Sequence, residues 1–166
     1  MMLRALVSVF LIACPALAAA QSAAHDDHTI VYAIGWAGDW SRHESLHPVG
    51  ATAGFEITPI EHWLSIETSL GAHHSDDGTE MPIEVAFRKP WQLSPRVEFM
   101  AGVAPEIIHA FGAQPETYGG VSVGGHFMIW PRQNLGWYAE SAYEVTFPRA
   151  GAHKGMGISA GILIGR

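Results

Sequence analysis

The feature that most constrains this chain is an alternation of apolar with polar or small residues, with a period of two, from about Thr29 to the last residue. In the stretch 95–109, one parity carries the apolar side chains Val97, Phe99, Ala101, Val103 and Ile107. The other parity carries Arg96, Glu98, Met100, Gly102, Ala104 and Glu106. Neighbouring side chains of a β-strand point to opposite faces, and no window shows a convincing 3.6-residue apolar period. The sequence therefore predicts an all-β chain.

Eight such segments can be counted, at approximately 29–41, 48–58, 62–73, 81–88, 95–109, 117–130, 135–147 and 154–165. Eight is the smallest usual number of strands in a closed membrane barrel. The strand lengths also match the roughly 9 to 11 residues that cross a bilayer when a strand is tilted. We expect one domain, an eight-stranded antiparallel up-and-down β-barrel of the transmembrane type.

The connections between these segments alternate in character. The stretches 58–61, 90–95 and 131–134 contain proline and are compact, as tight turns are. The other connections, 43–47, 74–80, 110–116 and 148–153, are more polar. With eight strands, both ends of the barrel domain lie on the side of the compact turns, which in an outer membrane is the periplasmic side.

The N-terminus has the pattern of a secretory signal peptide. One positive charge, Arg4, precedes an apolar run, and small residues follow at 18–20. We expect a signal peptide over 1–20, a short extension over 21–28 and the barrel domain over 29–166. Cys14 would leave with the signal, unless the early tetrapeptide 11–14 directs lipid attachment to it.

The polar parity is built from small residues and glutamates, which suit a narrow lumen better than a water-exposed face. Buried ions need partners or water. We therefore expect a salt-bridged lumen network, aided by Asp39 and the hydroxyls of Tyr118 and Tyr138. Its expected members are Glu56, Glu67, Glu84, Arg88, Arg96, Glu98, Glu106, His126, Glu140 and Glu144. A proton or cation path along the unbalanced carboxylates is the alternative.

The charged composition agrees with an exterior that largely avoids water. Only two lysines, Lys89 and Lys154, occur in the chain, and charged residues make up 15% of it, against about a quarter in average proteins. The net charge is −7, and loss of Arg4 would make it −8. This acidic balance argues against a nucleic-acid partner.

The tryptophans suggest two interfacial girdles. Trp63, Trp91, Trp130 and Trp137 lie at or beside the compact turns, and Trp36 and Trp40 are expected at the opposite end of the first segment. The parity of Trp63 and Trp130 points inward, however, so ordinary core tryptophans are the competing interpretation.

Three stretches carry a family resemblance: Thr58-Pro59-Ile60-Glu61-His62-Trp63-Leu64, Leu93-Ser94-Pro95-Arg96-Val97-Glu98-Phe99 and Gly136-Trp137-Tyr138. In them the chain resembles an uncharacterised group of small eight-stranded outer-membrane β-barrel proteins of Gram-negative bacteria. The resemblance implies an outer-membrane monomer that contacts membrane lipid and lipopolysaccharide, and it implies no cofactor. It carries no catalytic motif, and the chain ends in Arg166 where such barrels usually end in an aromatic residue.

The expected function is non-enzymatic, with an envelope-structural or surface-interaction role. One alternative is a soluble periplasmic lipocalin-like barrel that binds an apolar ligand. Another is a lipid-modifying hydrolase, for which His73, His74, Ser75 and Asp76 are the nearest local material. The ten histidines, including His25, His28, His43, His47, His109 and His153, have no spacing that fixes four metal ligands, so we expect no structured metal site.

One register can be predicted from a turn. If Trp130 lies opposite Gly136 across the turn at 131–134, then His126 lies opposite Glu140, and Met128, Gly124 and Ser122 face Tyr138, Ala142 and Glu144. The resulting pairs combine large with small side chains, as a narrow interior requires.

Overall fold

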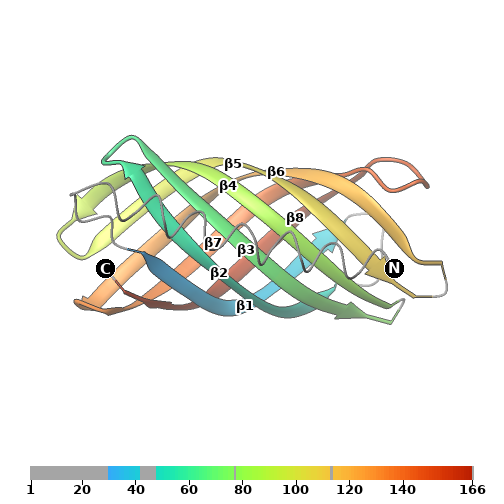
Figure 1. Cartoon of the computed structure of the whole chain (residues 1–166), viewed down its shortest axis with the longest axis horizontal. Helices are drawn as coiled ribbons and strands as arrows, with labels where there is room; N and C mark the ends of the chain where they lie inside the picture. The colour runs from blue at the N-terminus through green and yellow to red at the C-terminus, as the bar shows by residue number, and fades with distance from the viewer. Residues whose placement is uncertain (1–29, 42–47, 77, 113, 166) are drawn as a thin grey trace, which may run out of the picture.

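The computed structural model describes residues 30–41, 48–76, 78–112 and 114–165. Its strands are β1 Val31–Ser41, β2 Val49–Ile60, β3 Leu64–Ser75, β4 Gly78–Ser94, β5 Val97–Phe111, β6 Glu116–Arg132, β7 Leu135–Thr146 and β8 His153–Ile164. Each strand pairs antiparallel with its neighbours in sequence, and β1 pairs with β8 to close the barrel (Figure 1). The predicted fold class is confirmed. No helix among the described residues is long and apolar enough to cross a membrane.

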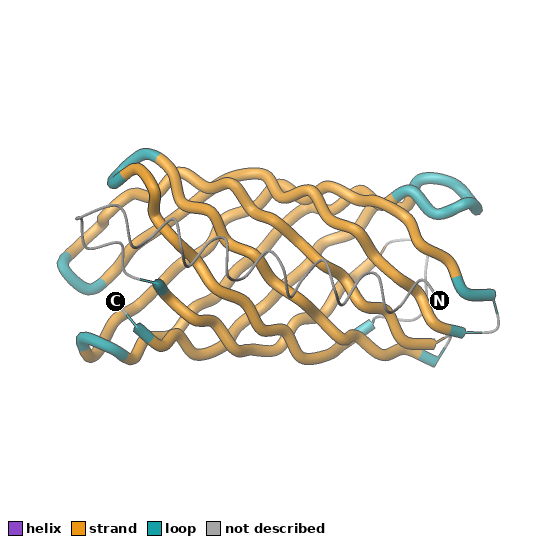
Figure 2. Tube along the Cα trace, viewed as in Figure 1, coloured by secondary structure: helices purple, strands orange, loops and turns teal. Residues whose placement is uncertain are grey.

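The two ends of the barrel differ, as Figure 2 shows. One end, here called the turn end, carries the tight connections 61–63, 95–96 and 133–134 and the C-terminal residues. At this end His62 adopts a positive φ of 58° in its turn. The other end, here called the loop end, carries the remaining connections. The predicted signal peptide 1–20, the extension 21–28 and the loop 43–47 lie outside the described residues.

The predicted bounds of β4 were wrong. The strand runs over 78–94, so the expected turn at 90–95 shrinks to Pro95 and Arg96. Pro90 pairs with Met100 of β5, whereas the ladder between β4 and β3 is not continued past Arg88. Proline is tolerated on such a one-sided edge because no ladder bond is lost there. Two other prolines are likewise unpaired on one side: Pro82 has no partner in the β3–β4 ladder, and Pro105 has none in the β4–β5 ladder.

The predicted register of β6 and β7 is confirmed. His126 lies opposite Glu140, and the same register pairs Met128 with Tyr138, Gly124 with Ala142 and Ser122 with Glu144. The ladder then shifts between Ile129 and Arg132, so the pair expected between Trp130 and Gly136 is replaced by an irregularity beside the turn. An added Cβ on Gly136 would lie 2.9 Å from the Trp130 ring, which explains the glycine at this position.

The two parities face opposite sides of the wall, as expected. The outward side chains are apolar and exposed, among them Ile34, Val103, Ile107, Val123, Phe127 and Ile158. Inside, the turn end is filled by an apolar group, here called the plug, which consists of Ala33, Met100, Met128, Trp130, Tyr138 and Leu163. Tyr138 lies over Gly35 and Gly161, where any added Cβ would collide with its ring or hydroxyl. Small inner residues thus make room for large ones.

Among the described side chains, the tryptophans form a girdle at the turn end. Trp63, at 59% exposure, Trp91 and Trp137 are exposed near the turn end. Trp130 is only 3% exposed and belongs to the plug, so its inclusion in a girdle was wrong. Trp36 is exposed but lies in the middle of β1 rather than at its end. The side chain of Trp40 lies outside the description.

Candidate functional site in the lumen

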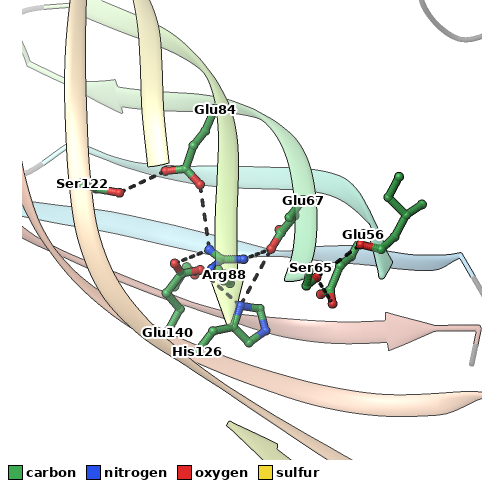
Figure 3. A network of polar contacts seen from close by, with 10 residues as sticks. Glu56, Ser65, Glu67, Glu84, Arg88, Ser122, His126 and Glu140 are labelled. Atoms are coloured by element: carbon green, nitrogen blue, oxygen red, sulfur yellow. Dashed lines mark hydrogen bonds and ion pairs between the residues drawn. The ribbon is translucent and has the colours of Figure 1, made fainter. Parts of the chain in front are cut away.

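Four inward residues from four strands meet across the lumen beside the plug: Glu67 of β3, Arg88 of β4, His126 of β6 and Glu140 of β7. We call this group the ionic belt (Figure 3). Two pairs lie on neighbouring strands: His126 is directly opposite Glu140 in the β6–β7 ladder, and Glu67 is diagonal to Arg88 in the β3–β4 ladder. Closure of the barrel brings β3 and β4 opposite β6 and β7, and the narrow interior then places their long side chains in contact.

Arg88 is the centre of the ionic belt. Its Nη1 donates to Glu67 Oε2, and its Nη2 donates to Glu140 Oε1 at 2.5 Å. A third carboxylate, Glu84, has its Oε1 3.9 Å from the same Nη2. Arg88 is 5% exposed. A guanidinium with several donors in a fixed plane can bind more than one carboxylate at once, which a lysine ammonium does less well.

His126 completes the ionic belt on the side that faces the plug. Its Nδ1 lies 3.5 Å from Glu140 Oε2 and 3.9 Å from Glu67 Oε2, and its ring stacks on Tyr138 with 5.2 Å between centroids. At 1% exposure it is one of the most buried side chains of the described barrel. His126 therefore joins the charged layer to the apolar plug.

Serine hydroxyls extend the polar contacts on both sides. Ser65 donates to Glu56 Oε1 at 2.5 Å, and Ser122 and Ser159 lie 3.5 Å from Glu84 and Glu140 respectively. These serines were not among the predicted site residues. Their inward parity was the available signal, since Ser65 shares the face of Glu67.

Towards the loop end the lumen widens into a cavity of about 340 Å³, here called the outer cavity. Its walls carry carboxylates from six strands: Asp39, Glu67, Glu80, Glu84, Glu106, Glu116, Glu140 and Glu144. The basic side chains among its lining residues are His73, His153 and Lys154. Asp39 Oδ2 lies 3.4 Å from His73 Nδ1, and Tyr118 donates to Glu80 Oε1 at 2.6 Å.

The ten predicted network residues divide into four groups. Glu56, Glu67, Glu84, Arg88, His126 and Glu140 lie in or next to the ionic belt, and Glu106 and Glu144 line the outer cavity. Glu98 lies at the turn end, opposite Gln92 and Met128. Arg96 does not lie in the lumen: β5 begins at Val97, so Arg96 falls in the turn and is exposed.

His73 and Glu80 were missed as lumen residues because the third strand was expected to end at residue 73 and the fourth to begin at residue 81, whereas β3 runs to Ser75 and β4 begins at Gly78. They continue the inward parities of Glu67 and Glu84. The residues named for the hydrolase alternative do not come together: His73 points inward to Asp39, whereas His74 is exposed and hydrogen-bonds to Thr79. Among the described residues, no three His, Cys, Asp or Glu side chains are grouped so that they could hold a metal ion.

No family model and no curated protein matches this chain. Several solved structures do. Neisserial surface protein A is 12% identical to this chain with a TM-score of 0.66, and the match covers 84% of this chain and 97% of that protein. Ail of Yersinia pestis is 14% identical with a TM-score of 0.52, and the match covers 84% of this chain and 100% of Ail. The N-terminal β-barrel domain of Pseudomonas aeruginosa OprF has 13% identity, a TM-score of 0.50, and 81% and 97% covered. The resemblance to small outer-membrane barrels is confirmed at the level of the fold.

Proposed function

We propose, from this shared fold, that the chain is a non-enzymatic outer-membrane protein that spans the bilayer as a monomeric barrel. The turn end lies in the periplasm and the loop end faces outward. The observation that carries the proposal is the inverted distribution of polarity. The outer wall exposes large apolar side chains such as Val123, at 57% exposure, while charged side chains such as Arg88 are buried inside. A soluble barrel needs the opposite arrangement, and a continuous exposed apolar surface marks contact with lipid or a partner.

The turn-end girdle supports the orientation along the membrane normal. Trp63, Trp91 and Trp137 are exposed there, and the Lys89 ammonium lies 5.8 Å from the Trp91 ring. Tryptophan rings and long cationic side chains favour the boundary between acyl chains and headgroups. This girdle therefore suits the inner boundary of the membrane.

The lumen supports a structural role rather than transport. The plug and the ionic belt occupy the turn-end half of the described barrel, and the outer cavity is lined on the loop-end side of them. Such a barrel offers a rigid platform for the connections at its loop end. Ail has been crystallised with a heparin analogue and studied in a phospholipid bilayer nanodisc, and by analogy we assign this chain a surface-interaction role beside outer-membrane lipid and lipopolysaccharide.

Electrophoresis and fractionation test the proposal. A closed barrel has no free strand edge from which to unravel, so the folded protein should resist SDS at room temperature and migrate differently after boiling. The exported protein should also sediment with outer membranes and need detergent to stay dispersed. Identical migration of verified folded and boiled samples, or a protein that stays soluble without detergent, would contradict the proposal.

A further inference from the structure

The wall of the barrel separates charge by sign. Every carboxylate in the described strands has inward parity, so none of these strands presents an acid to the membrane. Basic side chains of outward parity lie near the strand ends: Lys89 near the turn end, and His74 and His109 near the loop end. Such a wall is complementary to an anionic partner at the membrane boundary, which is the level of lipid phosphate groups.

One row of side chains crosses the outer wall at the loop end. His109 of β5 lies opposite Thr117 of β6, and His109 Nδ1 is 2.7 Å from Thr117 Oγ1. The β6–β7 register continues past its last ladder pair, because the N–H of Phe147 donates to the carbonyl of Gly119. Two residues farther along, the same register sets Arg149 beside Thr117. We call His109, Thr117 and Arg149 the rim row.

The two ends of the rim row carry donors that suit a phosphate. The Thr117 hydroxyl can donate to His109 Nδ1 or accept from it, and Nε2 of the ring is left for a partner outside the barrel. Arg149 is held by Glu116: its backbone N–H donates to Glu116 Oε1 at 2.7 Å, and its Nε lies 3.8 Å from the same oxygen. The Arg149 side chain is otherwise 90% exposed, and the terminal nitrogens of a planar guanidinium match phosphate oxygens.

The spacing lets both donors serve one group. The backbones of His109 and Arg149 are two strand spacings apart, about 10 Å, with Thr117 between them. Side chains as long as histidine and arginine can converge over the threonine from that separation. Charge-assisted hydrogen bonds from two sides are the usual way in which a phosphate is held.

The next row toward the middle of the wall is apolar and has a gap. Ile107 lies opposite Gly119, and Phe147 bonds to Gly119 from the other side. Ile107 and Phe147 are 59% and 56% exposed. An added Cβ on Gly119 would meet nothing nearer than a backbone oxygen at 3.8 Å, so the space between the two apolar side chains is open. A basic row beside an open apolar strip repeats the order of a lipid, a phosphate followed by acyl chains.

We propose that the rim row binds the anionic phosphate of a membrane lipid, with an acyl chain of the same lipid over Gly119 between Ile107 and Phe147. His109 Nε2 and the Arg149 guanidinium donate to the phosphate oxygens. The inference rests on the membrane function proposed above, and it adds the lipid chemistry and the residues that recognise it.

Solution NMR on the folded full chain in dodecyl maltoside micelles tests the site, because this detergent carries no phosphate. The His109 imidazole signal, assigned by its loss in His109→Asn, is followed while dihexanoyl phosphatidic acid is added. We expect a saturable shift of this signal. The His74 imidazole should shift little, because its row, with Thr79 and Phe111, contains no cation. Inorganic phosphate lacks acyl chains and should need at least about a tenfold higher concentration than the lipid.

Two variants separate the phosphate contact from the acyl contact. Arg149→Gln should weaken the affinity for phosphatidic acid about tenfold, as loss of a charged hydrogen bond does. Arg132→Gln removes the same charge at an exposed position of the turn end, and as the matched control it should bind as the parent does. Gly119→Leu fills the strip and should weaken the lipid about fivefold, while the response to inorganic phosphate stays unchanged.

Absence of a saturable His109 shift would overturn the proposal. So would an equal shift of the His74 signal, or an equal loss of affinity in Arg149→Gln and Arg132→Gln, because either would indicate diffuse charge attraction. Equal affinity of the parent for inorganic phosphate and for the lipid would also contradict it. A barrel that needs detergent and resists SDS but gives no His109 shift would remove this site and leave the membrane function standing.

Discussion

In the turn-end half of the lumen Arg88 contacts two carboxylates, His126 packs on the plug and Glu56 accepts from Ser65, whereas the loop-end half carries carboxylates around a cavity. Arg88 contacts two glutamates in the first region, and Met100 and Leu163 of the plug are fully buried. In the second region the acids outnumber the bases on the wall. Since removing one member of a paired, buried set is costly and removing one of several like charges is not, stability should be concentrated in the turn-end half.

The largest effect is expected at Arg88. Arg88→Met keeps much of the side-chain volume but leaves Glu67 and Glu140 buried without their cation. The free energy of unfolding, measured by urea titration in lipid vesicles, should fall by about 3 to 5 kcal/mol. Arg132→Met, at an exposed position of the turn end, should change it by no more than about 0.5 kcal/mol. Equal small effects of both variants would mean that the ionic belt does not stabilise the barrel.

The second-largest loss of stability is expected in the plug. Leu163→Ala opens a cavity in a completely buried site, and we expect a loss of about 2 to 5 kcal/mol in the same assay. The neighbouring Ile164 has the opposite parity and is 47% exposed, so Ile164→Ala leaves no internal cavity and should cost clearly less. A larger loss of stability for Ile164→Ala than for Leu163→Ala would show that the inward and outward faces of β8 are assigned the wrong way round.

His126→Ala should lower the free energy of unfolding by about 1 to 3 kcal/mol, the usual cost of leaving a buried polar partner unpaired. A double-mutant cycle with Glu140→Gln separates the pair from simple loss of packing on Tyr138. Coupling between the two sites is expected from the 3.5 Å contact. Strict additivity would show that His126 acts by packing alone, and His74→Ala serves as the exposed control.

The smallest effect is expected in the outer cavity. Glu144→Gln removes one of several like charges, so the free energy of unfolding should stay within about 0.5 kcal/mol of the parent value or rise slightly. A loss of several kcal/mol would remove the contrast between the two halves of the lumen.

Much of the fold was predictable from the sequence because a period of two determines both the strands and their faces. The register of His126 and Glu140 followed from a single short turn. Strand ends were harder to predict: Pro90 and Pro95 look alike in sequence, but only Pro95 lies in a turn, because the β3–β4 ladder stops before Pro90. The fifth strand, which was expected to begin at residue 95, begins at Val97, and that difference removes Arg96 from the lumen.

The contacts across the lumen could be predicted least. The sequence identified inward charges, but the convergence of Glu67, Arg88 and Glu140 depends on how far the strands are staggered around the closed barrel. Trp130 illustrates the same limit. Its parity indicated an inward side chain, yet its position beside a turn favoured a girdle, and the nearby glycine at position 136 makes room for the ring.

The central claim is that the outward parity faces lipid while the inward parity faces the ionic lumen. Single cysteines on the two faces test it most directly: Val103 and Val123 point outward and Ala104 and Ala142 inward, and each cysteine carries a fluorescent label in vesicles that contain brominated lipid. Ala104 and Ala142 serve better than glycine sites, because an added Cβ on Gly102 would collide with backbone of β4. We expect strong quenching at Val103 and Val123 and little at Ala104 and Ala142. Equal quenching at all four positions, or the reverse pattern, would contradict the membrane barrel.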